Sequence, residues 1–112
     1  MDKSKIASQL KRLKSQILAA FPKARVLVAG SLARGEYVDG SSDVDVIVIS
    51  PLFSGKNLVQ RLHGLNAAVD YPDFPVDLIP LLPEEYARKS KDRLNTLHFM
   101  AKDAKPVEAV IS

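Results

Sequence analysis

The first segment of the chain has apolar residues at helical spacing, with lysines and arginines between them. The apolar positions are Ile6, Leu10, Leu13, Ile17 and Phe21. This pattern predicts an amphipathic helix that ends at Pro22, because proline cannot continue a helix. A basic helix face can contact nucleic acid, but it is more often the solvated side of a helix that packs on a core. We assign this face no function.

Three short apolar runs rich in β-branched residues predict strands. The first, over residues 25–29, stops at Gly30, and the second, over residues 44–49, is apolar on both faces in its later half, as in a buried central strand. The third, over residues 76–81, contains Pro80. Proline cannot donate to a strand ladder, so this run suits a strand end or the edge of a sheet.

The remaining periodic segments predict three further helices and a last strand. One helix is expected over residues 56–69 with Ser54 as a candidate cap, another from Pro83, and a third over residues 92–103, supported by Leu94, Leu97, His98 and Ala101. Residues 107–111 are expected to form the last short strand. This order of elements predicts the α/β (α+β) class, with a mixed sheet covered by helices.

The composition is typical of a globular domain. The chain of 112 residues is 46% apolar and 26% charged, and it is long enough for one core but too short for two ordinary ones. No window approaches the roughly 18 uninterrupted apolar residues of a membrane span, and the charged N-terminus does not resemble a secretory signal. We therefore predict a single domain over residues 1–112, cytoplasmic and without a membrane partner.

The absence of cysteine excludes several kinds of site, whereas the net charge excludes none. Disulfides, thiolate metal sites and cysteine nucleophiles are excluded, so any metal must be held by oxygen or imidazole. The net charge of +3 suits polyanions such as nucleotides, but the excess is too small to decide, and nucleic acid is not excluded. The sequence does not fix the oligomeric state, and a homo-oligomer stays open.

Two carboxylates open the second predicted strand. Asp43 and Asp45 are two residues apart, so on a strand their side chains share one face. Like charges held side by side are costly, and a cation should offset that cost. Mg²⁺ fits best, with Mn²⁺ as the alternative, because hard ions take carboxylate oxygens and complete their shell with water and phosphate.

A third carboxylate, Asp77, lies on the third predicted strand and could join this pair if the strands are neighbours. Asp70 and Asp73, on the preceding loop, are the alternatives. Three carboxylates can hold two metal ions for in-line phosphoryl displacement, and Asp77 would then also be a candidate general base.

A glycine and a serine follow the first strand and can approach phosphate closely. Gly30 has no side chain, so backbone N–H groups and the Ser31 hydroxyl are accessible to phosphate oxygens, and Arg34 can add positive charge. Tyr37, in the same loop, could equally stack on a base or pack the loop. Ser54-Gly55-Lys56 is not a P-loop, because the upstream glycine and the final Ser or Thr are missing.

The strings Gly-Ser-Leu-Ala-Arg-Gly (30–35) and Ser-Asp-Val-Asp (42–45), followed by Asp77 between apolar neighbours, resemble the DNA polymerase beta-like nucleotidyltransferase superfamily, and within it the minimal nucleotidyltransferases. The resemblance covers the central half of the chain, with a slightly longer loop between the two strings. It implies the polymerase beta palm-like fold. The implied nucleotide-binding residues are Gly30, Ser31, Arg34 and Ser42, and the implied catalytic and metal-binding residues are Asp43, Asp45 and Asp77.

The resemblance also implies an activity and a partner. The expected reaction transfers a nucleoside monophosphate, AMP from ATP, to an acceptor hydroxyl, with two Mg²⁺ or Mn²⁺ ions bound alongside the nucleotide. The expected partner is a helical HEPN-type toxin, for which minimal nucleotidyltransferases act as antitoxins. The alternative is a binding module of little or no catalytic activity that neutralises its partner by contact. An antibiotic-modifying enzyme would need an added substrate domain, which the sequence does not indicate.

Overall fold

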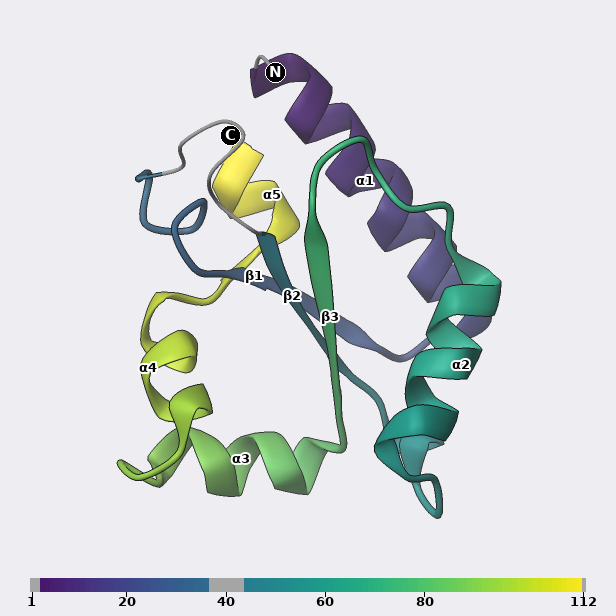
Figure 1. The fold of residues 1–112 in the computed structure, drawn as a ribbon, viewed down its shortest axis with the longest axis vertical. Helices are drawn as coiled ribbons and strands as arrows, with labels where there is room; N and C mark the ends of the chain where they lie inside the picture. Colours follow the sequence, from purple (N-terminus) through teal and green to yellow (C-terminus); the bar gives the residue numbers. More distant parts are fainter. Residues whose placement is uncertain (1–2, 37–43, 112) are drawn as a thin grey trace.

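The computed structural model describes residues 3–36 and 44–111, and these residues form a four-stranded sheet with helices on both faces (Figure 1). The elements in chain order are α1 (Lys3–Ala20), β1 (Arg25–Ala29), β2 (Val44–Ile49), the 3₁₀ helix η1 (Pro51–Phe53), α2 (Leu58–Ala68), β3 (Val76–Leu81), α3 (Pro83–Lys91), α4 (Thr96–Asp103), β4 (Lys105–Pro106) and α5 (Val107–Ile111). The strand order is β3-β2-β1-β4, with β2 and β3 parallel and the other pairs antiparallel. The predicted mixed sheet covered by helices is confirmed.

The two faces of the sheet carry separate cores. One face packs under α1, α2 and α5, and its strand residues are Val26, Val28, Val44, Val46, Val48 and Leu78. The other face packs under α3 and α4, and its buried strand residues are Leu27, Ala29, Ile47, Ile49 and Leu81. Because β2 supplies both cores, it is the buried central strand that its apolar sequence predicts.

The predicted amphipathic helix is also present, as α1. Its apolar positions Ile6, Leu10, Leu13 and Ile17 are each at most 5% exposed. None of the helices in the described ranges has both the length and the apolar character that crossing a lipid bilayer requires.

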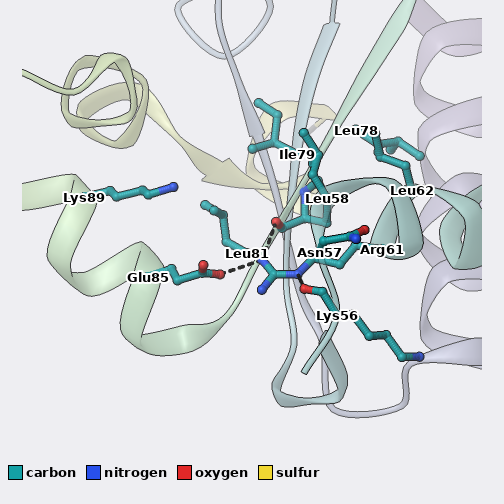
Figure 2. A pocket seen from close by; sticks show the side chains of 11 residues that line it. Lys56, Asn57, Leu58, Arg61, Leu62, Leu78, Ile79, Leu81, Glu85 and Lys89 are labelled. Carbon is teal, nitrogen blue, oxygen red and sulfur yellow. Dashed lines mark hydrogen bonds and ion pairs between the residues drawn. The ribbon is translucent and has the colours of Figure 1, made fainter. Parts of the chain in front are cut away.

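An ion pair crosses the open edge of the sheet (Figure 2). Arg61 on α2 reaches over β3, where its Nη1 donates to the Pro80 carbonyl (3.3 Å) and to the Glu85 carboxylate on α3 (2.6 Å). The Arg61 Nε donates to the Lys56 carbonyl (2.9 Å), and Glu85 also accepts from the Leu82 N–H (2.7 Å). Since proline has no N–H and its carbonyl is occupied, this end of the edge strand is protected from pairing with another strand. The prediction that Pro80 marks an edge is confirmed.

Two predicted helix starts are wrong. Asn57, not Ser54, caps α2, because its side chain accepts from the Gln60 N–H while the Gln60 side chain accepts from the Asn57 N–H, each at 2.9 Å. Residues 92–103 are helical only from Thr96, where Asn95 provides the cap. Leu94, which the apolar pattern included, precedes that cap and is 97% exposed.

The predicted last strand is also wrong. Residues 107–111 form the helix α5, and the strand is the two-residue β4 before it, which pairs with Leu27 and Val28 of β1. Val107 and Val110 are three residues apart, and both pack on the core beneath α1. The Glu108 carboxylate, on the outer side of α5, forms an ion pair with Lys14 of α1. Helical spacing therefore buries this segment better than an added strand would.

The ion pair across β3 yields a stability prediction. The side chains of Arg61 and Glu85 are only 11% and 22% exposed, so Glu85→Gln leaves a mostly buried guanidinium without its anion. We expect the free energy of unfolding at pH 7 to fall by about 2 kcal/mol, measured by urea denaturation. Glu84→Gln, the same change at the exposed neighbouring residue of α3, should stay within about 0.5 kcal/mol of the wild type.

This stability difference should depend on pH. Burial raises the pKa of Glu85, but the Leu82 N–H and the hydrogen bond and charge of Arg61 outweigh it and lower the pKa below its ordinary value. A carboxyl whose pKa is lowered on folding stabilises the fold fully above its unfolded pKa of about 4.3 and loses that contribution as the pH falls through the folded value. The difference between wild type and Glu85→Gln should therefore shrink from about pH 5 downward. An equal difference at pH 7 and pH 3 would contradict this.

Candidate active site

Strand register brings two of the predicted acidic residues together. Asp45 on β2 is the register partner of Asp77 on the parallel neighbour β3. Both alternate with residues of the core beneath α1, such as Val46 and Leu78, so both point to the opposite face, the one covered by α3 and α4. Asp45 is half-buried and Asp77 is exposed. Two carboxylates thus lie side by side at one end of the sheet.

The glycine-serine turn starts beside this pair. Ala29, the last residue of β1, is the register partner of Asp45, so Gly30 continues from the point where Asp45 stands. Gly30 has a φ of 81°, in the left-handed region where a side chain would be strained. The chain can therefore leave the strand sharply at this position.

Hydrogen bonds fold residues 30–36 into a helix-like turn. The Arg34 N–H donates to the Gly30 carbonyl (3.2 Å), the Gly35 N–H to the Leu32 carbonyl (3.1 Å), and the Glu36 N–H to the Ser31 carbonyl (2.8 Å). The N–H groups of residues 31–33 come before these donors, and at the start of a helical turn such groups have no acceptor within the turn. They are suited to an anion such as phosphate.

Arg34 connects the turn to α4. Its Nε lies 3.2 Å from the Glu36 carboxylate and its Nη1 lies 3.7 Å from the Asp103 carboxylate at the end of α4. The side chains of Arg34 and Asp103 are 42% and 40% exposed, and ion pairs at such exposure contribute about 0–1 kcal/mol. A triphosphate, which accepts several charge-assisted hydrogen bonds, can displace these carboxylates from Arg34.

A hollow of about 420 Å³ opens between the turn, β2 and α4. The turn contributes Gly30, Ser31 and Arg34, β2 contributes Asp45, and α4 contributes Thr96, Phe99, Met100 and Asp103. Asp77 lies one strand further out. The α4 residues were not predicted from the sequence, and their local signal is Phe99 and Met100, two large apolar residues outside the predicted apolar stripe of that helix.

The other sequence candidates separate clearly. Asp70 forms an ion pair with Arg12 (2.9 Å), and Asp73 forms hydrogen bonds with Gln9, so both are engaged with α1. Asp77 is therefore the candidate of this stretch that shares a face with Asp45. Three further candidates, Tyr37, Ser42 and Asp43, lie outside the described residues.

The donor set fits a hard divalent cation. Asp45 and Asp77 present carboxylate oxygens on one face, the ligands that Mg²⁺ and Mn²⁺ prefer. Residues 3–36 and 44–111 contain no cluster of three potential ligands, and the third carboxylate that the sequence predicts, Asp43, falls between these ranges.

The negative charge of Asp77 also affects a neighbouring tyrosine. Burial and then the charge of Asp77 raise the pKa of Tyr71, whose hydroxyl donates to the Asn66 side chain.

Comparison with known families decides what kind of domain this is. The family model of the nucleotidyltransferase domain matches residues 6–104. The chain belongs to this nucleotidyltransferase family. The domain is also similar to the crystal structure of a "putative nucleotidyltransferase" from Sulfolobus solfataricus, with a TM-score of 0.56 and 29% identity over 79% of this chain and 82% of that chain. The search of curated proteins found no match. These findings confirm the resemblance read from the motifs.

The carboxylate pair of this nucleotidyltransferase domain should weaken the fold when no metal is present. Asp77→Asn removes one of two like charges in register, so we expect the free energy of unfolding in EDTA at pH 7 to rise by about 0.5 kcal/mol. Asp70→Asn should lower the free energy of unfolding by about the same amount, because Arg12 then loses its charged partner. Urea denaturation measures both changes, and a loss of stability in Asp77→Asn would contradict the repulsion.

Proposed function

We propose that this domain transfers a nucleoside monophosphate from a nucleoside triphosphate to an acceptor hydroxyl, with ATP as the donor. The observation that carries the proposal is the pairing of Asp45 with Asp77 beside the Gly30–Ser31 turn. In this reaction the acceptor oxygen bonds to the α-phosphorus, the bond from that phosphorus to the bridging oxygen breaks, and pyrophosphate leaves. The hydroxyl proton passes to a carboxylate, and Asp77 is the candidate base.

The proposed roles follow from the positions of the described residues and, for Ser42 and Asp43, from the resemblance of residues 42–45. The N–H groups of the turn and the Ser31 hydroxyl hold the phosphates, Arg34 adds positive charge, and Ser42 is a further nucleotide contact. Asp43, Asp45 and Asp77 would hold two Mg²⁺ or Mn²⁺ ions. When bound, such ions polarise phosphoryl oxygens and neutralise developing charge. The protein's part is to position the triphosphate and the acceptor in line.

We further propose a HEPN-type toxin as partner and acceptor. The similarity of residues 30–35 and 42–45 to minimal nucleotidyltransferases supports this assignment. Modification of the toxin by AMP transfer would make the domain a catalytic antitoxin.

Transfer of label tests the proposal. The purified domain is incubated with α-labelled ATP, Mg²⁺ and a HEPN-type protein from the same genome, and label on that protein is quantified. We expect Asp45→Asn to slow the transfer by about 100-fold or more, since loss of a metal ligand removes several kcal/mol of transition-state stabilisation. Asp70→Asn, an equivalent change on the α1 side, should retain the wild-type rate. Equal transfer by wild type and Asp45→Asn would contradict the assignment.

The same assay separates catalysis from neutralisation by contact. If no label is transferred and Asp45→Asn neutralises the toxin as well as the wild type does, the domain is a binding module. Neutralisation that requires Asp45, ATP and Mg²⁺ together supports the catalytic reading.

A further inference from the structure

Phe99 is an exposed aromatic residue in the wall of the candidate active site. Its side chain is 58% exposed, whereas Leu97 on the same helix is 5% exposed in the core beneath α3 and α4. The hollow that Phe99 lines is the one that contains Gly30, Ser31 and Asp45. A large apolar surface therefore stands beside the turn proposed to hold the phosphates.

The packing of α4 fixes this orientation. Thr96, Phe99, Met100 and Asp103 follow the i, i+3, i+4, i+7 spacing of one helix face, and all four line the hollow. Leu97 packs on the sheet, as does Ala104, which follows the helix, and Met100 both lines the hollow and packs against that core. His98 Nδ1 lies 2.7 Å from the Ser90 carbonyl, which ties α4 to α3, and the His98 ring meets Phe99 edge-on at 5.1 Å. Phe99 is thus presented to the hollow by a helix held on its other side.

A cation accompanies the aromatic ring. The Lys102 Nζ lies 5.6 Å from the Phe99 ring centroid, within cation–π range. Arg34 lies on the wall of the same hollow. Aromatic faces combined with nearby positive charge are the usual means of holding a base and its phosphates without reading the base edge.

We propose that Phe99 is the platform on which the nucleobase of the bound triphosphate stacks. The inference rests on the proposed function, because it requires the phosphates to lie at residues 30–35. Stacking needs only a π-face, so Phe99 contributes affinity for any nucleobase, and purines, with their larger face, bind more tightly than pyrimidines.

The test compares a nucleotide with a phosphate chain that has no base. Binding of a non-hydrolysable ATP analogue and of inorganic tripolyphosphate, each with Mg²⁺, is measured by calorimetry. Phe99→Ala should weaken binding of the analogue about tenfold, the loss expected for one stacked base, and leave tripolyphosphate binding unchanged. Phe99→Tyr, which keeps an aromatic ring, should bind the ATP analogue as tightly as the wild type does. Val59→Ala, at an apolar position 75% exposed on α2, should change the affinity for neither ligand.

A fluorescent variant provides a second readout. The chain has no tryptophan, so Phe99→Trp places a single reporter at the platform. The ATP analogue should quench its fluorescence and tripolyphosphate should not, while a Val59→Trp control should respond to neither.

The outcomes separate the two proposals. If the wild type binds both ligands and Phe99→Ala binds the analogue as tightly as the wild type, the platform is wrong and the phosphate site stands. If Phe99→Ala weakens both ligands equally, Phe99 supports the site without contacting the base, and the platform is again wrong. If the wild type binds neither ligand with Mg²⁺, the proposed function fails and the platform fails with it.

Discussion

The pairing of β2 with β1 on one side and β3 on the other fixes where the described residues of the candidate site lie. Asp45 stands opposite both Ala29 and Asp77, so the glycine-serine turn and the second carboxylate are positioned by one register. A slip of one residue would turn Asp45 into the core beneath α1. The Val and Ile side chains of β2 would stay buried after that slip, because the strand is apolar on both faces. The slip is opposed instead by the cost of burying the Asp45 carboxylate without a partner, which is on the order of several kcal/mol.

The two ends of β3 carry different arrangements of charge. At its C-terminal end, Arg61 and Glu85 close the edge with a satisfied ion pair. At its N-terminal end, Asp77 and Asp45 bring like charges together, which a folded protein tolerates where a ligand supplies the opposite charge. The mostly buried pair stabilises the fold, whereas the carboxylate pair beside the hollow is suited to function.

Much of this arrangement follows from local sequence, because strand alternation and proline and glycine positions act over a few residues. Residues 76–81 form a strand as predicted. Alternation alone leaves open whether Asp77 shares a face with Asp45, because that depends on the pairing of β2 with β3. The strand predicted over residues 107–111 is wrong because so short an apolar run fits the period of a helix as well as that of a strand. Its packing on α1 selects the helix. The contact of Arg34 with Asp103, and the place of Phe99 beside the turn, depend on how α4 docks, which no local pattern records.

A crystal structure with Mn²⁺ and a non-hydrolysable nucleoside triphosphate would show whether Asp45 and Asp77 hold metal beside the turn. We expect an anomalous peak for Mn²⁺ within about 2.0–2.6 Å of carboxylate oxygens from Asp45 and Asp77, with the phosphates on the turn of residues 30–35. Nucleotide bound elsewhere, with both carboxylates free of metal, would contradict it.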